Sequence, residues 1–111
     1  MFKNIPISEV VNLSDLVEYQ PGQAVSRTVA QNSRVSVTLF AFTAGEGLST
    51  HTASGDALVH VLDGQALITI DKEEMTIPAG QAVVLPANIP HAVAAPENFK
   101  MLLVIIKPEK P

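Results

Sequence analysis

The sequence predicts an all-β sandwich or barrel, folded as a single domain over residues 1–111. The stretch SRVSVTLFAF, residues 33–42, alternates between two faces with a period of two, as a strand does. From residue 57 to residue 108, short apolar and β-branched runs are separated by turn-forming residues. Eight prolines and six glycines are spread along the chain, which shows no internal repeat or linker. Closely spaced strands with turns between them are typical of this fold class.

The strand predicted within residues 33–42 has one very apolar face. Its two faces carry Val35, Val37, Leu39 and Ala41 on one side, and Ser36, Thr38, Phe40 and Phe42 on the other. At least five further short strands follow. The breaks between them are expected at Asp63-Gly64, Asp71-Lys72, Pro78-Ala79-Gly80, Pro86-Ala87-Asn88 and Pro96-Glu97-Asn98.

The remaining segments give weaker signals. SDLVEY can form one helical turn, with Ser14 as its N-cap. AGEGLSTH, which holds Gly45 and Gly47, is expected to form a loop that enters the site region. The terminal FKMLLVIIKP is continuously apolar, as is typical of a strand buried on both faces, either in the core or under a partner subunit.

Composition excludes several classes of function. The chain has no cysteine, so disulfides, thiolate metal ligands and cysteine nucleophiles are absent. Its net charge is -4 and its seven basic residues are scattered singly. We therefore expect neither nucleic acid nor a membrane surface as a partner. The N-terminal MFKNIPISEV lacks the apolar segment of a signal peptide, so the expected location is the cytoplasm.

Two motifs give the chain a family resemblance. In the first, five residues separate Gly45 from His51, and Gly64 closes the motif. In the second, GQAVVLPANIPHAVAA supplies Gly80, Pro86 and His91 in register, with Asn88 where a second glycine usually stands. On these residues the chain resembles a small single-domain cupin of the conserved-barrel type. The resemblance implies a double-stranded β-helix, a jelly-roll barrel of two antiparallel sheets with a pocket inside one end.

The resemblance also implies where metal ligands would lie. In similar proteins the first motif provides two histidines and a Glu or Gln, and the second motif provides one histidine. His51 and His91 match two of these positions, but Ala53 and Ala57 stand where the other two ligands belong, and Ala95 replaces the closing Asn. We therefore expect either no cofactor or a weakly held divalent transition metal (Zn, Ni, Mn or Fe) on His51 and His91.

Two neighbouring residues could restore a third ligand. Asp56 and His60 point away from the face of residue 57 on a regular strand, so either would need a β-bulge to reach the site, and the SGD at 54–56 is a place for one. The structural alternative gives the two motif histidines no ligand. His51 would then be satisfied by a backbone carbonyl, and His91 would fill a turn-to-strand junction.

Two functional hypotheses of different classes follow. The first is a protein that binds a small organic molecule near His51 and His91, in a pocket lined by strand residues such as Phe40, Phe42, Val59, Val61 and Val83. The second is a metal-dependent oxygenase, isomerase or lyase that uses both histidines and a third ligand. A sensory module acting through a separate protein is a weaker third hypothesis. Like similar cupins, the chain is expected to form a homodimer, which would cover its strand edges.

Overall fold

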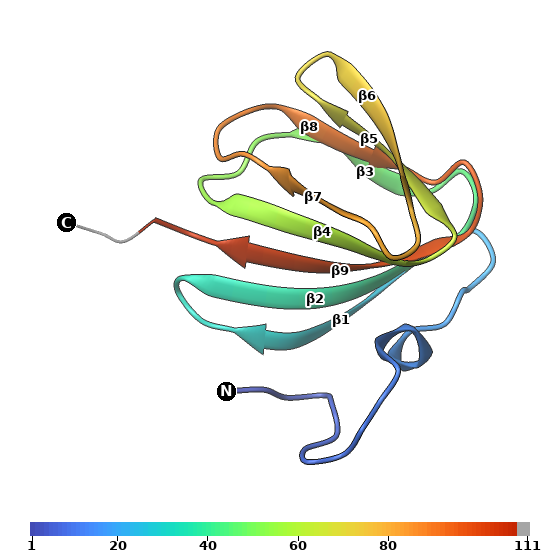
Figure 1. Cartoon of the computed structure of the whole chain (residues 1–111), viewed down its shortest axis with the longest axis vertical. Coiled ribbons are helices and arrows are strands. Elements are labelled where there is room, and N and C mark those ends of the chain that lie inside the picture. The colour runs from blue at the N-terminus through green and yellow to red at the C-terminus, as the bar shows by residue number, and fades with distance from the viewer. Residues whose placement is uncertain (109–111) are drawn as a thin grey trace.

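The computed structural model describes residues 1–108, and within them nine strands form two antiparallel sheets (Figure 1). The five-stranded sheet has the order β1 (Ala24–Gln31), β2 (Val35–Phe42), β9 (Phe99–Ile106), β4 (Asp56–Asp63) and β7 (Ala82–Leu85). The four-stranded sheet has the order β3 (Gly47–His51), β8 (His91–Ala94), β5 (Gln65–Ile70) and β6 (Glu73–Pro78). The prediction of an all-β fold with two antiparallel sheets is confirmed.

Most predicted elements are found, but two strands differ from the prediction. All five predicted breaks separate strands β4 to β9. AGEGLSTH is not only a loop, because its second half is β3, and β1 was missing from the prediction. Both strands carry weak signals: β3 is largely exposed and polar, and a register shift between Thr28 and Ala30 interrupts the alternation of β1.

The helical turn is a 3-10 turn, η1 (Leu13–Leu16), and Ser14 is not its N-cap. Asn12 occupies that position without a side-chain hydrogen bond. Ser14 lies inside the turn, and its carbonyl accepts a hydrogen bond of 2.6 Å from Lys100 Nζ. The short segment is therefore fixed by a tertiary contact and not by a cap.

A hydrophobic core lies on each side of the five-stranded sheet. The core between the two sheets is centred on the fully buried Phe42, Phe99 and Met101. The rings of Phe40, Phe42 and Phe99 stack in series, with centroids 5.3 and 5.0 Å apart. The second core lies on the other face of the sheet, where the N-terminal segment packs over Leu39 and Ala41. The predicted division of residues 35–42 into two faces is thus confirmed, and both faces are used.

Strand β9 lies in the middle of its sheet. It pairs with β2 on one side and β4 on the other, so its backbone edge needs no partner. Leu102 packs against the outer core while Met101 is buried in the inner one, as expected for a strand covered on both faces. Among the described residues, the open edges of the two sheets belong to β1, β7, β3 and β6.

The N-terminal segment runs beside β1 (Figure 1). Polar contacts tie this segment to the barrel. Tyr19 donates a hydrogen bond to Asp63, and the ammonium of Lys100 lies 4.9 Å from the centre of the Tyr19 ring. Burial and the Asp63 carboxylate raise the pKa of Tyr19 well above its ordinary value, so this phenol keeps its proton and remains a donor. None of the helical segments in residues 1–108 has the length and apolar character needed to span a bilayer.

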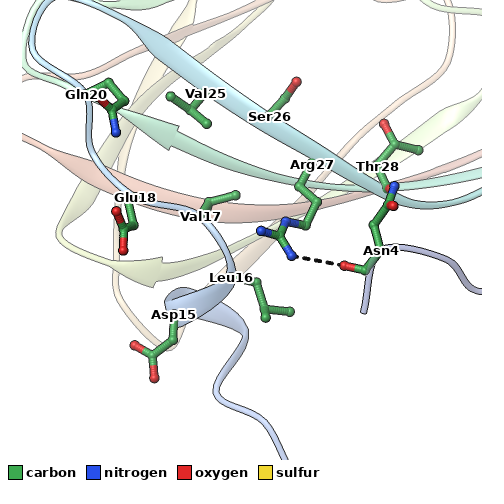
Figure 2. Close-up of a pocket in the computed structure, with 10 residues that line it drawn as sticks. All are labelled: Asn4, Asp15, Leu16, Val17, Glu18, Gln20, Val25, Ser26, Arg27 and Thr28. Carbon is green, nitrogen blue, oxygen red and sulfur yellow. Dashed lines mark hydrogen bonds between the residues drawn. The ribbon is translucent and has the colours of Figure 1, made fainter. Parts of the chain in front are cut away.

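Between this segment and β1 lies an open groove of about 450 Å³ (Figure 2). Arg27 crosses it and donates a hydrogen bond to the carbonyl of Asn4. The groove shares no residue with the cavity described below. Its walls are formed by Asn4, Asp15, Leu16, Val17, Glu18, Gln20, Val25, Ser26, Arg27 and Thr28.

Candidate functional site

His51 and His91 are brought together by the pairing of β3 with β8. His51 ends β3, His91 begins β8, and the two residues are register partners. Their Nε2 atoms lie 3.2 Å apart, and the ring centroids are separated by 4.4 Å with the planes at 71°. Two residues that are 40 positions apart in the sequence therefore form one imidazole pair.

The other nitrogen of each ring contacts a backbone carbonyl. His51 Nδ1 lies 2.7 Å from the oxygen of Ser49, and His91 Nδ1 lies 3.1 Å from the oxygen of Ile89. His51 is exposed, whereas His91 is only 5% exposed. Burial lowers the pKa of His91, with the nearby His51 adding to that effect and the Ile89 carbonyl opposing it. His91 is therefore held in its neutral form over a wider pH range than an exposed histidine.

Both histidines line a narrow cavity inside the barrel. It offers about 40 Å³ to the centre of a water-sized sphere. Apart from the imidazole pair, every wall residue is apolar. The complete lining consists of Leu48, His51, Ala53, Ala57, Val59, Leu85, His91, Val93, Met101, Leu103 and Ile105.

Ala53 and Ala57 both line this cavity, as the motif alignment requires. Ala57 is buried on the inner face of β4, and Ala53 lies just beyond the end of β3. The methyl groups of these residues thus stand where two metal ligands would be expected.

Comparison with known proteins agrees with this geometry. A family model for the cupin domain matches residues 38–107. The chain belongs to the cupin family. A conserved protein of unknown function from Streptococcus pyogenes has a similar structure, with 41% identity over 98% of this chain and 96% of that one, and a TM-score of 0.95.

Two further solved structures are also similar. A cupin superfamily protein from Desulfitobacterium hafniense shares 33% identity over 97% of this chain and 99% of that one, with a TM-score of 0.93. A cupin 2 conserved barrel domain protein from Leptotrichia buccalis shares 47% identity over 87% of this chain but only 47% of that one, with a TM-score of 0.85. No curated protein matches the chain. The cupin jelly-roll barrel is confirmed, and the relatives leave the activity open.

The donor set of this cupin does not fit the metal site that its family suggests. A catalytic metal site usually has at least three protein ligands. Within residues 1–108, no three His, Cys, Asp or Glu side chains are grouped closely enough to hold a metal ion. Two imidazoles converge, and no other side chain of the cavity wall has a nitrogen or oxygen donor atom. The imidazole pair therefore falls short of the ligand set of a catalytic metal site.

Asp56 and His60 do not supply a third ligand in this cupin. The pairing of β4 with β7 and β9 keeps its register from Asp56 to Val61, so no bulge turns either side chain inward. Asp56 instead accepts a hydrogen bond of 2.8 Å from the backbone nitrogen of Ala87, which ties β4 to the loop before β8. His60 is half-buried, in register with Ala82 and Leu102.

Of the apolar residues predicted to line the ligand pocket, only Val59 lies in the cavity wall. Phe42 and Val61 are fully buried in the core between the sheets, and Phe40 and Val83 pack against that core. Period-two alternation identifies the inward face of a strand, but it does not indicate how far along the barrel an inward residue lies. Among the missed wall residues, Leu85 and Val93 lie on strands with the same inward signal, so register alone distinguishes them, whereas Leu48 lies on β3, whose signal is weak.

The turns between the motif residues also follow the cupin pattern. Gly64 has a φ of 68°, and a Cβ there would clash with the backbone of Asn98. Asn88, which replaces the second glycine of the second motif, has a φ of 64°. Asparagine tolerates this left-handed conformation better than most residues do. The replacement therefore preserves the loop that leads to His91.

Proposed function

We propose that this cupin binds a small organic molecule in the barrel cavity, with His51 and His91 as its polar contacts. One observation carries the proposal: two imidazole Nε2 atoms converge at an otherwise apolar cavity. Ligand pockets commonly combine apolar walls with a few converging polar groups. Val59 supports the ligand directly, while Phe40, Phe42 and Val61 support the wall from the core behind it.

The size of the cavity limits the ligand. A single water needs roughly 10–15 Å³ by the same measure, so the 40 Å³ here corresponds to about three waters. The buried part of the ligand is therefore only a few heavy atoms. A drug-sized or nucleotide-sized molecule would need the walls to move apart.

A metal-dependent oxygenase, isomerase or lyase is the second candidate. The observation that favours it is the convergence of both Nε2 atoms, since histidines commonly bind metals through a lone pair on that atom. It requires a third ligand from outside the described cavity wall, such as solvent. This makes the metal content of the purified protein the measurement that separates the two candidates.

We expect elemental analysis of the untagged protein to find less than one equivalent of any transition metal. In parallel, a screen of small fragments by methyl NMR should perturb Leu48, Val59, Leu85 and Val93 around the cavity. His51→Ala and His91→Ala should weaken these perturbations, whereas the matched variant His60→Ala, in a half-buried histidine outside the cavity wall, should not. One equivalent of metal that disappears in both site variants would instead favour the enzyme.

We also propose that the chain forms a homodimer. Leu58 and Val84 are register partners and are 39% and 53% exposed. Large apolar side chains of the N-terminal segment are exposed too, among them Met1, Phe2, Ile7 and Val10. Several exposed apolar side chains on one protein favour association with a second copy, which would bury them. We expect light scattering at micromolar concentration to give the dimer mass, and a monomer mass alone would refute the proposal.

A further inference from the structure

The hydrogen-bond contacts of the imidazole pair require more hydrogens than the pair carries. Each Nδ1 faces a backbone carbonyl oxygen, which can only accept, so both contacts need a proton on Nδ1. The Nε2–Nε2 contact of 3.2 Å needs a third proton. Two neutral imidazoles have only one N–H each. One hydrogen is therefore missing from the site.

The two carbonyl contacts determine which nitrogen atoms lack the hydrogen. With protons on both Nδ1 atoms, His51 and His91 present Nε2 lone pairs toward each other. No other side chain of the cavity wall can donate a hydrogen bond to them, since all the others are apolar. Because His91 is buried, leaving its Nε2 without a donor costs about 1–3 kcal/mol. The molecule that binds beside the pair is the natural source of the donor.

We propose that the cavity takes a small neutral molecule with an O–H or N–H donor head, such as a short-chain alcohol or primary amide. This inference deepens the proposed function and rests on it. The head donates to an Nε2 atom of the pair, and the aliphatic part lies against Ala53, Ala57 and Val59. A head with two hydrogens on one atom can satisfy both acceptors.

The same geometry disfavours charged ligands. A carboxylate offers only lone pairs and would face the two Nε2 lone pairs directly. An ammonium group has the hydrogens, but the cavity wall holds no carboxylate to balance its charge on leaving water. A neutral molecule with a donor is the class of ligand that supplies the hydrogen and brings no charge into the cavity.

Propionamide and propionate provide a test, because they have the same size and shape, and propionate lacks the donor and carries a negative charge. At about pH 8, above the ordinary imidazole pKa, we expect propionamide to bind at least roughly tenfold more tightly than propionate. Methyl NMR titration measures both affinities. His91→Leu should abolish the preference, and the matched variant His60→Leu should retain it.

Long-range ¹H–¹⁵N spectra of the ligand-free protein test the premise independently. We expect both His51 and His91 to carry their proton on Nδ1 at about pH 8. A proton on Nε2 of either ring, or propionate binding as tightly as propionamide, would overturn the inference. If other fragments still bind in the cavity, only the ligand class is wrong. If no fragment perturbs the cavity, the proposed function fails as well.

Discussion

Replacing Gly47 by alanine is expected to lower the thermal midpoint of unfolding by more than about 10 °C, equivalent to some 2 kcal/mol or more for a domain of this size. Gly47 begins β3 opposite Ala94 of β8. A Cβ at this position would overlap the carbonyl oxygen of Val93 and lie 3.2 Å from the Cα of Ala94. Both obstacles are backbone atoms in the neighbouring strand, so β3 must move away from β8.

The same displacement should reach the site. Only three residue pairs define the β3–β8 register, and the pair of His51 with His91 is one of them. We therefore expect Gly47→Ala also to change the ring signals of both histidines. Gly22→Ala is the matched control, because Gly22 has a φ of 68° but no atom within 4 Å of the added Cβ. It tests backbone strain alone, which costs about 1–2 kcal/mol.

Calorimetry or circular dichroism of the two variants separates the effects. If the thermal midpoint of Gly47→Ala falls no further than that of Gly22→Ala, β3 can move away from β8 without lowering the stability of the fold. The close approach of β3 and β8 would then not be what holds the histidines together.

The sequence predicts this fold where the local signal and the tertiary structure agree. The breaks at Asp63-Gly64 and Asp71-Lys72 are turns whose residues adopt positive φ at Gly64 and Asp71, and such turns are set locally. Strand β3 could not be predicted in this way. Its five residues are mostly polar and exposed, and they form a strand because β8 offers a backbone partner.

In the candidate site, too, some features could be predicted from the sequence and others depend on the tertiary structure. His51 and His91 stand at motif spacings, so their meeting was predictable from the family resemblance. The lining of the cavity was not, because Phe42 and Val59 carry the same inward signal yet one lies in the core and the other in the cavity wall. Depth along the barrel depends on the pairing of strands far apart in sequence, which alternation does not encode.

The double variant Ala53→His with Ala57→Glu is expected to bind zinc or nickel at least about a hundredfold more tightly than the parent, or some 2.7 kcal/mol. Both alanines line the cavity that His51 and His91 share. The Nε2 atoms of these histidines are 3.2 Å apart, close to the roughly 3.3 Å between two nitrogens bound to one tetrahedral zinc. Two added donors would complete a site that two imidazoles alone leave weak.

Competition titration with a chromophoric chelator measures this affinity in the parent, both single variants and the double variant. Ala94→His with Ala24→Glu is the matched control, because it adds the same two side chains at exposed positions outside the cavity wall. The control should bind as weakly as the parent, since its new groups lie on different sheets and cannot join the imidazole pair. A folded double variant no tighter than this control would show that side chains at 53 and 57 do not reach the point where the two Nε2 atoms converge. The loss of ligands at those positions could then not explain why this cupin departs from the metal-binding pattern of its family.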